Sequence, residues 1–567
     1  MSVEAPLKVV ICWHMHQPNY YAPGRGHYCL PWTYLHATKD YVDMVALLEA
    51  NPQARAVVNF APILLEQIDD YVRQLRDWHD KQAPIKDPLL AALAAAVMPA
   101  AEHERLAIAH QCIRVNHDHL VKPFSEYERL VKLVQQLEEE PQLFMYLGDQ
   151  FLVDLLVWYH LAWLGETVHQ NDLRVSRLVK KGCGFSLHDR HELLGIIDEL
   201  LSNVIARYRV LAEHGQIELS MNPYAHPIVP LMLDMQSARE AWPDVLLPEE
   251  GQYPGGEERA RWHMQQGIKV FEQFFGHRPA GCWPSEGGLS TATVKLFDEF
   301  GMRWAASGES VLRNSLFQAG RVKEIDSQQA LYRPYRIACS QAACFFRDDG
   351  LSDLIGFTYS DWHGDDAAGN LVKQLEHIAR HTPARGERVV SIILDGENAW
   401  EHYPHNGHFF LSALYEGIAE HPLLEMTTFS DVLDAGMPVD ALEEIVAGSW
   451  VYGTFSTWVG NRDKNAGWNL LIEAKRSFDE VVASGKLKPE QLRLAEQQLA
   501  VCEGSDWFWW FGDYNPAETV SDFEHLFRTH LAHLYRLLGI EAPESLSHEV
   551  SHGSGTPEHG GAMRRGH

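Results

Sequence analysis

The sequence predicts an α/β protein built on a parallel sheet, with a helical insertion and a helical C-terminal domain. Three observations predict it: seven short apolar runs have the character of strands, helical patterns separate them, and a polar cluster follows each run. Most runs are continuous rather than alternating, which indicates burial on both faces. Strands that alternate with helices predict a parallel sheet, open or closed into a barrel.

The expected strands are spread over the first 400 residues. In chain order they are Lys8–Trp13, Ala56–Phe60, Gln216–Ser220, Gly281–Trp283, Arg303–Ala306, Ala343–Phe346 and Val389–Leu394. Helical patterns such as Glu257–Phe275 and Thr291–Phe300 lie between them. We therefore assign residues 1–435 to one catalytic domain.

One connection, from about residue 66 to residue 214, is too long for a single crossover helix. Four of its segments have helical periodicity: Asp87–Ala101, His103–Val115, Val121–Glu140 and Leu193–Glu213. We interpret the stretch as a helical insertion, part of which folds over the barrel mouth.

The pattern changes after about residue 435, where the strand-like runs stop. Leu470–Ser484, Lys488–Cys502 and Asp522–Leu538 have helical periodicity, so residues 436–546 are predicted to form a helical domain. The tail, residues 547–567, is rich in Gly, Ser and His and is predicted to be disordered. Metal capture by its histidines is the alternative.

The net charge excludes some classes of partner. With 48 Lys and Arg against 77 Asp and Glu, the formal charge is −29. Such a surface repels phosphate backbones and anionic membranes, so we expect neither a nucleic-acid nor a membrane partner. There is no stretch of 18 or more apolar residues, so no spanning helix is expected. The oligomeric state is left open.

The N-terminus and the cysteines predict a cytoplasmic protein. Residues 1–18 lack the basic start, long apolar run and cleavage site of a secretion signal. The eight cysteines are scattered without a CxxC pair, which fits a reducing compartment. This spacing argues against a disulfide framework and against a thiolate zinc site.

Aromatic residues are abundant, at 11% of the chain. Many sit in clusters that also contain Gly, Asn and Asp, including Trp13, Trp32, Trp362, Trp400 and the run Trp507–Phe511. Core packing explains each of them singly. Aromatic rings beside amides and carboxylates also suit sugars, whose C–H faces stack on rings while their hydroxyls need hydrogen-bond partners.

Chemically capable side chains follow the expected strands. In order they are His14 and His16, Asn59, Asn222 and His226, Glu286, Ser307, Arg347 and Asp348, and Asp395. In parallel α/β barrels the C-terminal strand ends open onto one face, where the active site is built. His14 and His16 share one face of their strand, which suits a metal, sugar hydroxyls or a structural role.

Two carboxylates at different strand ends suit glycoside hydrolysis. Glu286 precedes two glycines that let a ligand approach, and Asp395 ends an apolar run. One carboxylate attacks the anomeric carbon and the other protonates the leaving oxygen; about 5–5.5 Å between them gives retention and a wider gap gives inversion. Their pKa values must differ, and His14, His16 and Arg347 are candidates to set that difference.

These motifs give the chain a resemblance to glycoside hydrolase family 57, a family of α-amylases and 4-α-glucanotransferases. The family's HQP matches residues 16–18, its GQ-hydrophobic-E region residues 215–218, its W-P-x-E region residues 283–286 and its D-x-E region residues 395–397. A fifth aromatic and polar region is similar to the stretch around Trp458 and Trp468.

The resemblance implies a distorted (β/α)7 barrel, a retaining mechanism and no required metal or cofactor. It implies that Glu286 is the nucleophile, that Asp395 is the general acid/base, and that His16 and the Trp283 region line the subsite of the reacting sugar. Together with the strand-end residues, we expect the substrate to be bound by His14, His16, Asn222, His226, Trp283, Arg347, Trp400, Trp458 and Trp468.

The leading hypothesis is therefore an α-glucan hydrolase or transglycosylase acting on starch, glycogen or maltooligosaccharides. The second is a metal-dependent carbohydrate enzyme of the zinc mannosidase or deacetylase type, although the first strand has His-Met-His rather than His-x-Asp. The third is a glucan-binding protein without catalysis, which would need neither carboxylate.

Overall fold

The computed structural model describes residues 5–137, 141–325, 328–338, 340–382, 388–555 and 563. Its centre is a curled sheet in the neighbour order β10-β1-β4-β5-β6-β7-β9. These strands are parallel throughout, and all seven were predicted: β1 (Leu7–Met15), β4 (Ala56–Phe60), β5 (Ile217–Met221), β6 (Gly281–Cys282), β7 (Trp304–Ser307), β9 (Ala343–Phe346) and β10 (Val389–Asp395).

The sheet closes into a distorted barrel where the chain just after β9 meets β10, and this contact is short. A single parallel bridge joins Arg347, just after β9, to Ser391 on β10, and Asp348 N–H donates to the Ser391 carbonyl at 2.8 Å. The fold class expected from the sequence is confirmed.

Five short strands were not predicted. They are the hairpin β2 (Tyr21–Ala22) and β3 (His27–Tyr28), and the edge strands β8 (Tyr335–Ile337), β11 (Leu424–Met426) and β12 (Asp440–Leu442). Because β12 pairs in parallel with β8, the chain is still part of the sheet beyond residue 435. The predicted domain boundary at residues 435/436 is therefore too early, and the helical part begins near residue 462.

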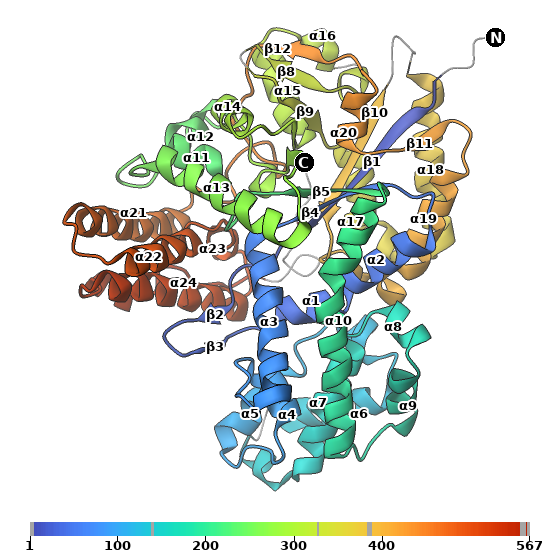
Figure 1. The fold of residues 1–567 in the computed structure, drawn as a ribbon, viewed down its shortest axis with the longest axis vertical. Coiled ribbons are helices and arrows are strands. Elements are labelled where there is room, and N and C mark those ends of the chain that lie inside the picture. The colour runs from blue at the N-terminus through green and yellow to red at the C-terminus, as the bar shows by residue number, and fades with distance from the viewer. Residues whose placement is uncertain are drawn as a thin grey trace.

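Helices cover the outer face of the sheet (Figure 1). The helices and helical turns of this part of the chain, apart from the insertion, are α1 (Trp32–Thr38), α2 (Asp40–Ala50), α11 (Val229–Leu233), η3 (Met235–Ser237), α12 (Ala238–Ala241), α13 (Gly256–Phe275), η4 (Ser285–Gly287), α14 (Thr291–Glu299), α15 (Glu309–Gln318), α16 (Val322–Ile325), η5 (Gln328–Ala330), α17 (Asp349–Phe357), η6 (Tyr359–Asp361), α18 (Gly364–His381), η7 (Trp400–His402), η8 (Pro404–Gly407), α19 (His408–Ala419) and α20 (Phe429–Asp434).

The insertion between β4 and β5 is helical, as expected, and projects away from the sheet (Figure 1). Its elements are α3 (Pro62–Lys81), α4 (Pro88–Ala94), α5 (Glu102–Gln111), η1 (His117–Val121), α6 (Ser125–Leu137), η2 (Pro141–Tyr146), α7 (Asp149–Ala162), α8 (Glu166–Asn171), α9 (Leu173–Lys181) and α10 (Leu187–Glu213). Helix α4 ends at Ala94, seven residues before the predicted Ala101, and Ala95 has extended backbone (φ −66°, ψ 139°).

The C-terminal part packs beside the barrel as a group of helices (Figure 1). They are α21 (Arg462–Ala483), α22 (Pro489–Cys502), α23 (Asp506–Trp510), α24 (Ala517–Leu538) and η9 (Glu544–Ser547). A buried ion pair attaches them to α13: Arg259 Nη2 lies 2.7 Å from Glu503 Oε2, which also accepts a hydrogen bond from His263 Nε2 at 2.8 Å.

The start of the tail is ordered, contrary to the prediction of disorder from residue 547. Ser551 is buried, and its hydroxyl accepts a hydrogen bond from the Gly512 N–H at 2.9 Å. Residues 556–562 and 564–567, where the same prediction applies, lie outside the described residues.

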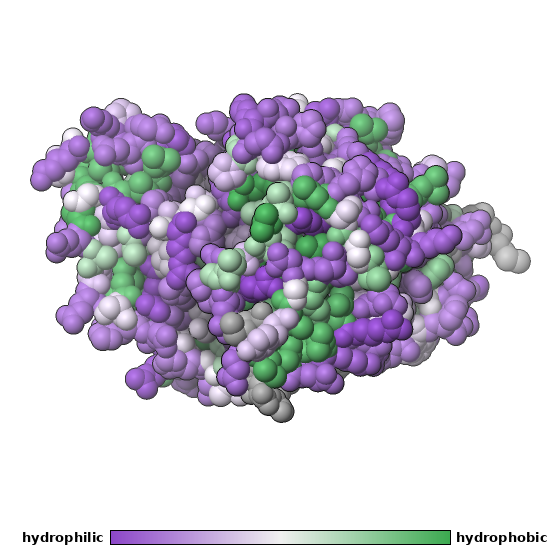
Figure 2. Space-filling model, turned by 90° about the horizontal axis from the view of Figure 1, so that it is seen from below, coloured by the Kyte–Doolittle hydropathy of each residue, from purple (hydrophilic) through white to green (hydrophobic). Residues whose placement is uncertain are grey.

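The surface is largely polar. In the view of Figure 2, hydrophilic residues dominate and hydrophobic ones form small separate patches. Within the described ranges, no helix combines the length and apolar character needed to cross a bilayer. The seven cysteines among the described residues are free thiols.

Candidate active site

A row of polar residues crosses four neighbouring strands inside the barrel. Strand register pairs Asp395 on β10 with His14 on β1, His14 with Asn59 on β4, and Asn59 with Ser220 on β5. Registered neighbours in a sheet point to the same face, so the row forms one layer of the interior. His14 Nδ1 lies 2.7 Å from Asn59 Oδ1, and Asn59 Nδ2 donates to Ser220 Oγ at 3.1 Å.

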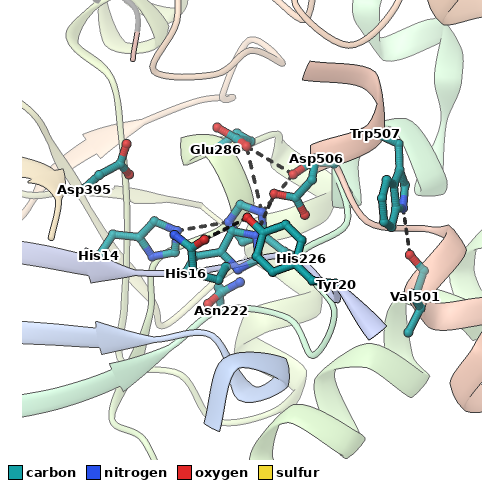
Figure 3. A network of polar contacts seen from close by, with 12 residues as sticks. His14, His16, Tyr20, Asn222, His226, Glu286, Asp395, Val501, Asp506 and Trp507 are labelled. Carbon is teal, nitrogen blue, oxygen red and sulfur yellow. Dashed lines mark hydrogen bonds and ion pairs between the residues drawn. The ribbon is translucent and has the colours of Figure 1, made fainter. Parts of the chain in front are cut away.

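His14 belongs to this row, and the rings of His16 and His226 stack with it (Figure 3). The rings of His16 and His226 are 3.8 Å apart and nearly parallel, and His14 Nε2 lies 3.1 Å from His226 Nε2. Burial lowers the pKa of His14 to about 3 and holds that of His226 well below its ordinary value. Both rings are therefore neutral near neutral pH.

Glu286 is presented by a sharp turn after β6. Its own backbone is left-handed (φ 58°), a region that a non-glycine residue adopts only where the surroundings impose it. The turn is held by Trp450 N–H, which donates to the Glu286 carbonyl at 3.2 Å. The next residue, Gly287 (φ 59°), must lack a side chain, because a Cβ there would lie 3.0 Å from the Trp450 Cβ.

Among the residues that the structure describes, neutral hydrogen-bonding side chains and the negative charges of Asp395 and Asp506 act on the Glu286 carboxyl. Ser505 Oγ lies 3.1 Å from its Oε1, and Trp450 Nε1 lies 3.4 Å from its Oε2. Burial, followed by the charges of Asp395 and Asp506, raises the pKa of Glu286 to about 8. The group is therefore mostly protonated at neutral pH.

Asp395 lies at the end of β10 in a more favourable setting for charge. Asn398 Nδ2 donates to its Oδ2 at 3.0 Å. Burial raises the pKa of Asp395 to about 6, against the lowering effects of Asn398 and of positive charge on His16 and Arg347. Two of the three residues that we expected to set the carboxylates apart, His16 and Arg347, therefore act on Asp395, whereas His14 is neutral.

Five of the predicted residues line one cavity of about 240 Å³: His14, His16, His226, Glu286 and Asp395. The structure brings them together from four strand ends, β1, β5, β6 and β10, as predicted. Figure 3 shows Glu286 and Asp395 above the histidine rings, with Asp395 toward His14 and Glu286 toward His226. The two carboxyls share the cavity, and the charge of Asp395 raises the pKa of Glu286.

The four tryptophans predicted to contact the sugar do not line this cavity. Trp283, Trp400, Trp458 and Trp468 are at most 1% exposed. Trp468 stacks on Phe508 at 4.4 Å, and Trp458 packs against Trp509. Core packing, the simpler interpretation of a large apolar ring, is correct for these four.

Asn222 and Arg347 also lie outside the cavity. Asn222 is fully buried beneath the site. Arg347 is held by two carboxylates, with Nη1 2.6 Å from Asp349 and Nη2 2.7 Å from Asp353. It adjoins a smaller cavity next to Asp395, so it acts on the site through its charge rather than by direct contact with ligand in the main cavity.

The cavity has a wall that the sequence analysis missed. Asp506, Trp509 and Trp510 reach it from α23, and Trp450 reaches it from the segment after β12. His16 Nε2 lies 2.8 Å from Asp506 Oδ1, so the helical part completes the site. The α23 residues follow a helix, and Trp450 lies beyond the short strand β12, so none of them follows an apolar run that the strand-end signal could find. The signal for Trp509 and Trp510 was the aromatic run Trp507–Phe511 itself, with Asp506 directly before it.

His16, His226 and Asp506 have potential ligand atoms within 4.8 Å of one another. His16 Nε2 is already engaged by Asp506, and the two rings stack with only 19° between their planes. Lone pairs in nearly parallel planes 3.8 Å apart do not converge on one point. We therefore assign these residues to hydrogen bonding and not to metal binding.

The sequence matches the model of a known protein family. The model of glycosyl hydrolase family 57 matches residues 10–444. Among curated proteins, a 1,4-alpha-glucan branching enzyme from Thermococcus kodakarensis is 20% identical over 452 residues. That alignment covers 67% of this chain and 63% of the relative, so the chain spans less than two thirds of the relative's length.

Solved structures share the fold. A GH57-type branching enzyme from Pyrococcus horikoshii superposes with a TM-score of 0.60 at 15% identity, covering 94% of this chain and 89% of that chain. The alpha-amylase AmyC from Thermotoga maritima gives a TM-score of 0.56 at 15% identity, with 96% of each chain covered. These likenesses confirm the barrel with a helical C-terminal part.

Proposed function

The chain belongs to glycosyl hydrolase family 57, and on that premise we propose that it cleaves or rearranges α-glucans with retention of anomeric configuration. The observation that carries the proposal is the pair of carboxyls, Glu286 and Asp395, that face one cavity from two strand ends. The named relatives, a branching enzyme and an alpha-amylase, support the substrate class.

In the proposed reaction Glu286 attacks the anomeric carbon and forms a glycosyl-enzyme ester. Asp395 protonates the departing glycosidic oxygen, then removes a proton from the acceptor that releases the sugar. Water as acceptor gives hydrolysis, and a sugar hydroxyl gives transglycosylation or branching. Trp450, Trp509 and Trp510 line the cavity and are the rings we propose to stack on the sugar.

The decisive experiment follows the products formed from maltooligosaccharides, starch and glycogen. Proton NMR during the first turnovers should show α-configured reducing ends, as retention requires. First products of β configuration would contradict the covalent mechanism. Longer or α-1,6-linked products would identify a transferase, whereas glucose and short oligosaccharides alone would identify a hydrolase.

A chelator tests the alternative of a metal-dependent carbohydrate hydrolase. The protein should keep its full glucan turnover after dialysis against EDTA, with metal content followed by mass spectrometry. Loss of turnover that returns on addition of one divalent metal would favour the alternative.

A further inference from the structure

Ser505 comes from the helical C-terminal part but lies inside the barrel site. Its backbone N–H donates to the His226 carbonyl at 2.9 Å, which fixes its position beside the histidine. Gly504 permits this approach, since a Cβ there would lie 3.0 Å from the Ala225 carbonyl oxygen. The Ser505 side chain is fully buried, so no bulk water competes for its hydroxyl.

The Ser505 hydroxyl lies between two groups that titrate. It is 2.8 Å from His226 Nδ1 and 3.1 Å from Glu286 Oε1. A hydroxyl donates one proton and accepts others. If Ser505 donates to an ionised Glu286, its bond to His226 requires a proton on Nδ1. If His226 Nδ1 is bare and accepts from Ser505, the bond to Glu286 requires a proton on the carboxyl.

The chain of bonds continues away from Ser505. His226 Nε2 meets His14 Nε2 at 3.1 Å, and His14 Nδ1 meets Asn59 Oδ1 at 2.7 Å. With neutral rings and Asn59 in this orientation, His14 donates to Asn59 and accepts from His226. His226 Nδ1 is then bare, and Glu286 carries the proton.

From this geometry we propose that Ser505 is a proton relay that couples the ionisation of Glu286 to protonation of His226 at Nδ1. The proposal rests on the role of Glu286 given above and adds a positioning residue from outside the barrel. In the unliganded site the proton is on Glu286, and the relay gives it a destination within the site when the carboxylate is needed for attack.

The transfer balances without any other reactant. The O–H bond of the Glu286 carboxyl breaks as its proton binds Ser505 Oγ, and the original Ser505 proton moves to His226 Nδ1. The products are a carboxylate, an unchanged hydroxyl and an imidazolium. The new charges attract each other, since His226 Nδ1 lies 3.9 Å from Glu286 Oε1.

The other charges around the pair act on both ends of the relay. Positive charge on His16 or on His14 opposes the imidazolium, because both rings stack on His226. Asp395 and Asp506 both oppose ionisation of Glu286. Burial also favours the neutral form of each partner, and the pKa of Glu286 is accordingly raised and that of His226 lowered.

Two serines beside Glu286 provide the test and its control. Ser505→Ala removes the relay hydroxyl. Ser285→Ala removes a buried hydroxyl of the neighbouring residue that has no hydrogen-bond partner among the described residues. In the full-length protein, Ser505→Ala should move the alkaline limb of the kcat/KM profile up by about one pH unit, because the carboxylate loses a donor, and lower the maximum about tenfold. Ser285→Ala should leave the profile in place.

A second measurement does not depend on turnover. Isotope-edited infrared spectra with labelled glutamate and histidine follow both groups, and Glu286→Gln identifies the carboxyl band. In the wild-type protein, the bands that report protonation of His226 Nδ1 should change at the same pH as those that report ionisation of Glu286. In Ser505→Ala the two sets of bands should change at different pH values. Two results would overturn the relay. One is normal glucan turnover without any infrared change at His226, and the other is the same pH profile of kcat/KM for Ser505→Ala and Ser285→Ala. Coupled titration in a protein that transforms no α-glucan would instead contradict the proposed function alone.

Discussion

Glu286 and Asp395 occupy equivalent positions in the fold but opposite electrostatic surroundings. Each follows a buried parallel strand and faces the same cavity. Positive charge on His16 and Arg347 acts on Asp395, whereas Glu286 has only neutral donors and two negative neighbours. The pKa of Glu286 is about 8 and that of Asp395 about 6, although burial raises both.

Because the pKa of Glu286 is the higher of the two, a single proton shared by the pair is bound mostly to Glu286, the carboxyl that we propose as the nucleophile. The reaction needs the opposite arrangement, with Glu286 ionised and Asp395 protonated. A gap of two pKa units leaves about one per cent of the singly protonated molecules in that arrangement. The proposed reaction therefore requires a route that moves the proton off Glu286, and the proposed Ser505 relay supplies one.

The largest expected effect is loss of either carboxyl. Glu286→Gln and Asp395→Asn should each lower kcat by about a thousandfold or more while the fold is retained, as judged by circular dichroism. Added azide then distinguishes the roles: the Asp395 variant should yield an α-glycosyl azide and the Glu286 variant a β-glycosyl azide. If the Asp395 variant gave the β-glycosyl azide and the Glu286 variant the α-glycosyl azide, the roles of nucleophile and acid/base would be exchanged. Near-normal turnover in the Glu286 variant would contradict both assignments.

The next effect is on the pH profile. The kcat/KM for a maltooligosaccharide should be bell-shaped, with limbs near pH 6 and pH 8, since the pair must carry one proton. Activity should fall about tenfold for each pH unit outside these limbs. A single limb, or limbs below pH 5, would show that burial does not raise both pKa values.

The raised pKa of Glu286 should also make the stability of the protein depend on pH. Because the folded pKa of Glu286 is about 8 against an ordinary 4.5, its contribution to stability is complete below pH 4.5 and is lost as the pH rises through 8. Glu286→Gln removes that loss, so the variant should be more stable than wild type by on the order of 3 kcal/mol above pH 8 and similar to it below pH 4.5. Urea unfolding of both proteins below pH 4.5 and above pH 8 measures the difference in unfolding free energy. A Glu286→Gln variant that is less stable than wild type above pH 8 would contradict a raised pKa for Glu286.

The smallest effect should come from Trp450→Phe. The indole N–H lies 3.4 Å from Glu286, so its loss should raise the alkaline limb by only a few tenths of a pH unit. The phenyl ring keeps an aromatic surface, so KM for maltooligosaccharide should change less than threefold. Trp468→Phe, in the core, is the matched control and should alter stability without altering KM.

The sequence predicted the barrel and the residues at its strand ends, for a physical reason. Parallel strands are buried on both faces, so they are visible as continuous apolar runs, and their C-terminal ends meet at one face. His14, His226 and Asp395 were found in this way. Short edge strands such as β12 have no such run, so the domain boundary was placed too early.

The rest of the site depends on long-range packing that no local pattern encodes. Trp468 and Trp509 both lie on helices of the C-terminal part, yet the first is in the core and the second lines the cavity. The difference is set by how α21 and α23 dock on the barrel. Ser505 and Asp506 were missed because only that docking brings them to the strand ends.

The hydrogen bond between His16 and Asp506 spans 490 positions. During synthesis, the barrel strands leave the ribosome long before the segment that finishes their cavity. A nascent or prematurely terminated chain therefore lacks both the carboxylate that engages His16 and the hydroxyl that serves Glu286. Enzyme activity should appear only after this late segment has been made and has docked.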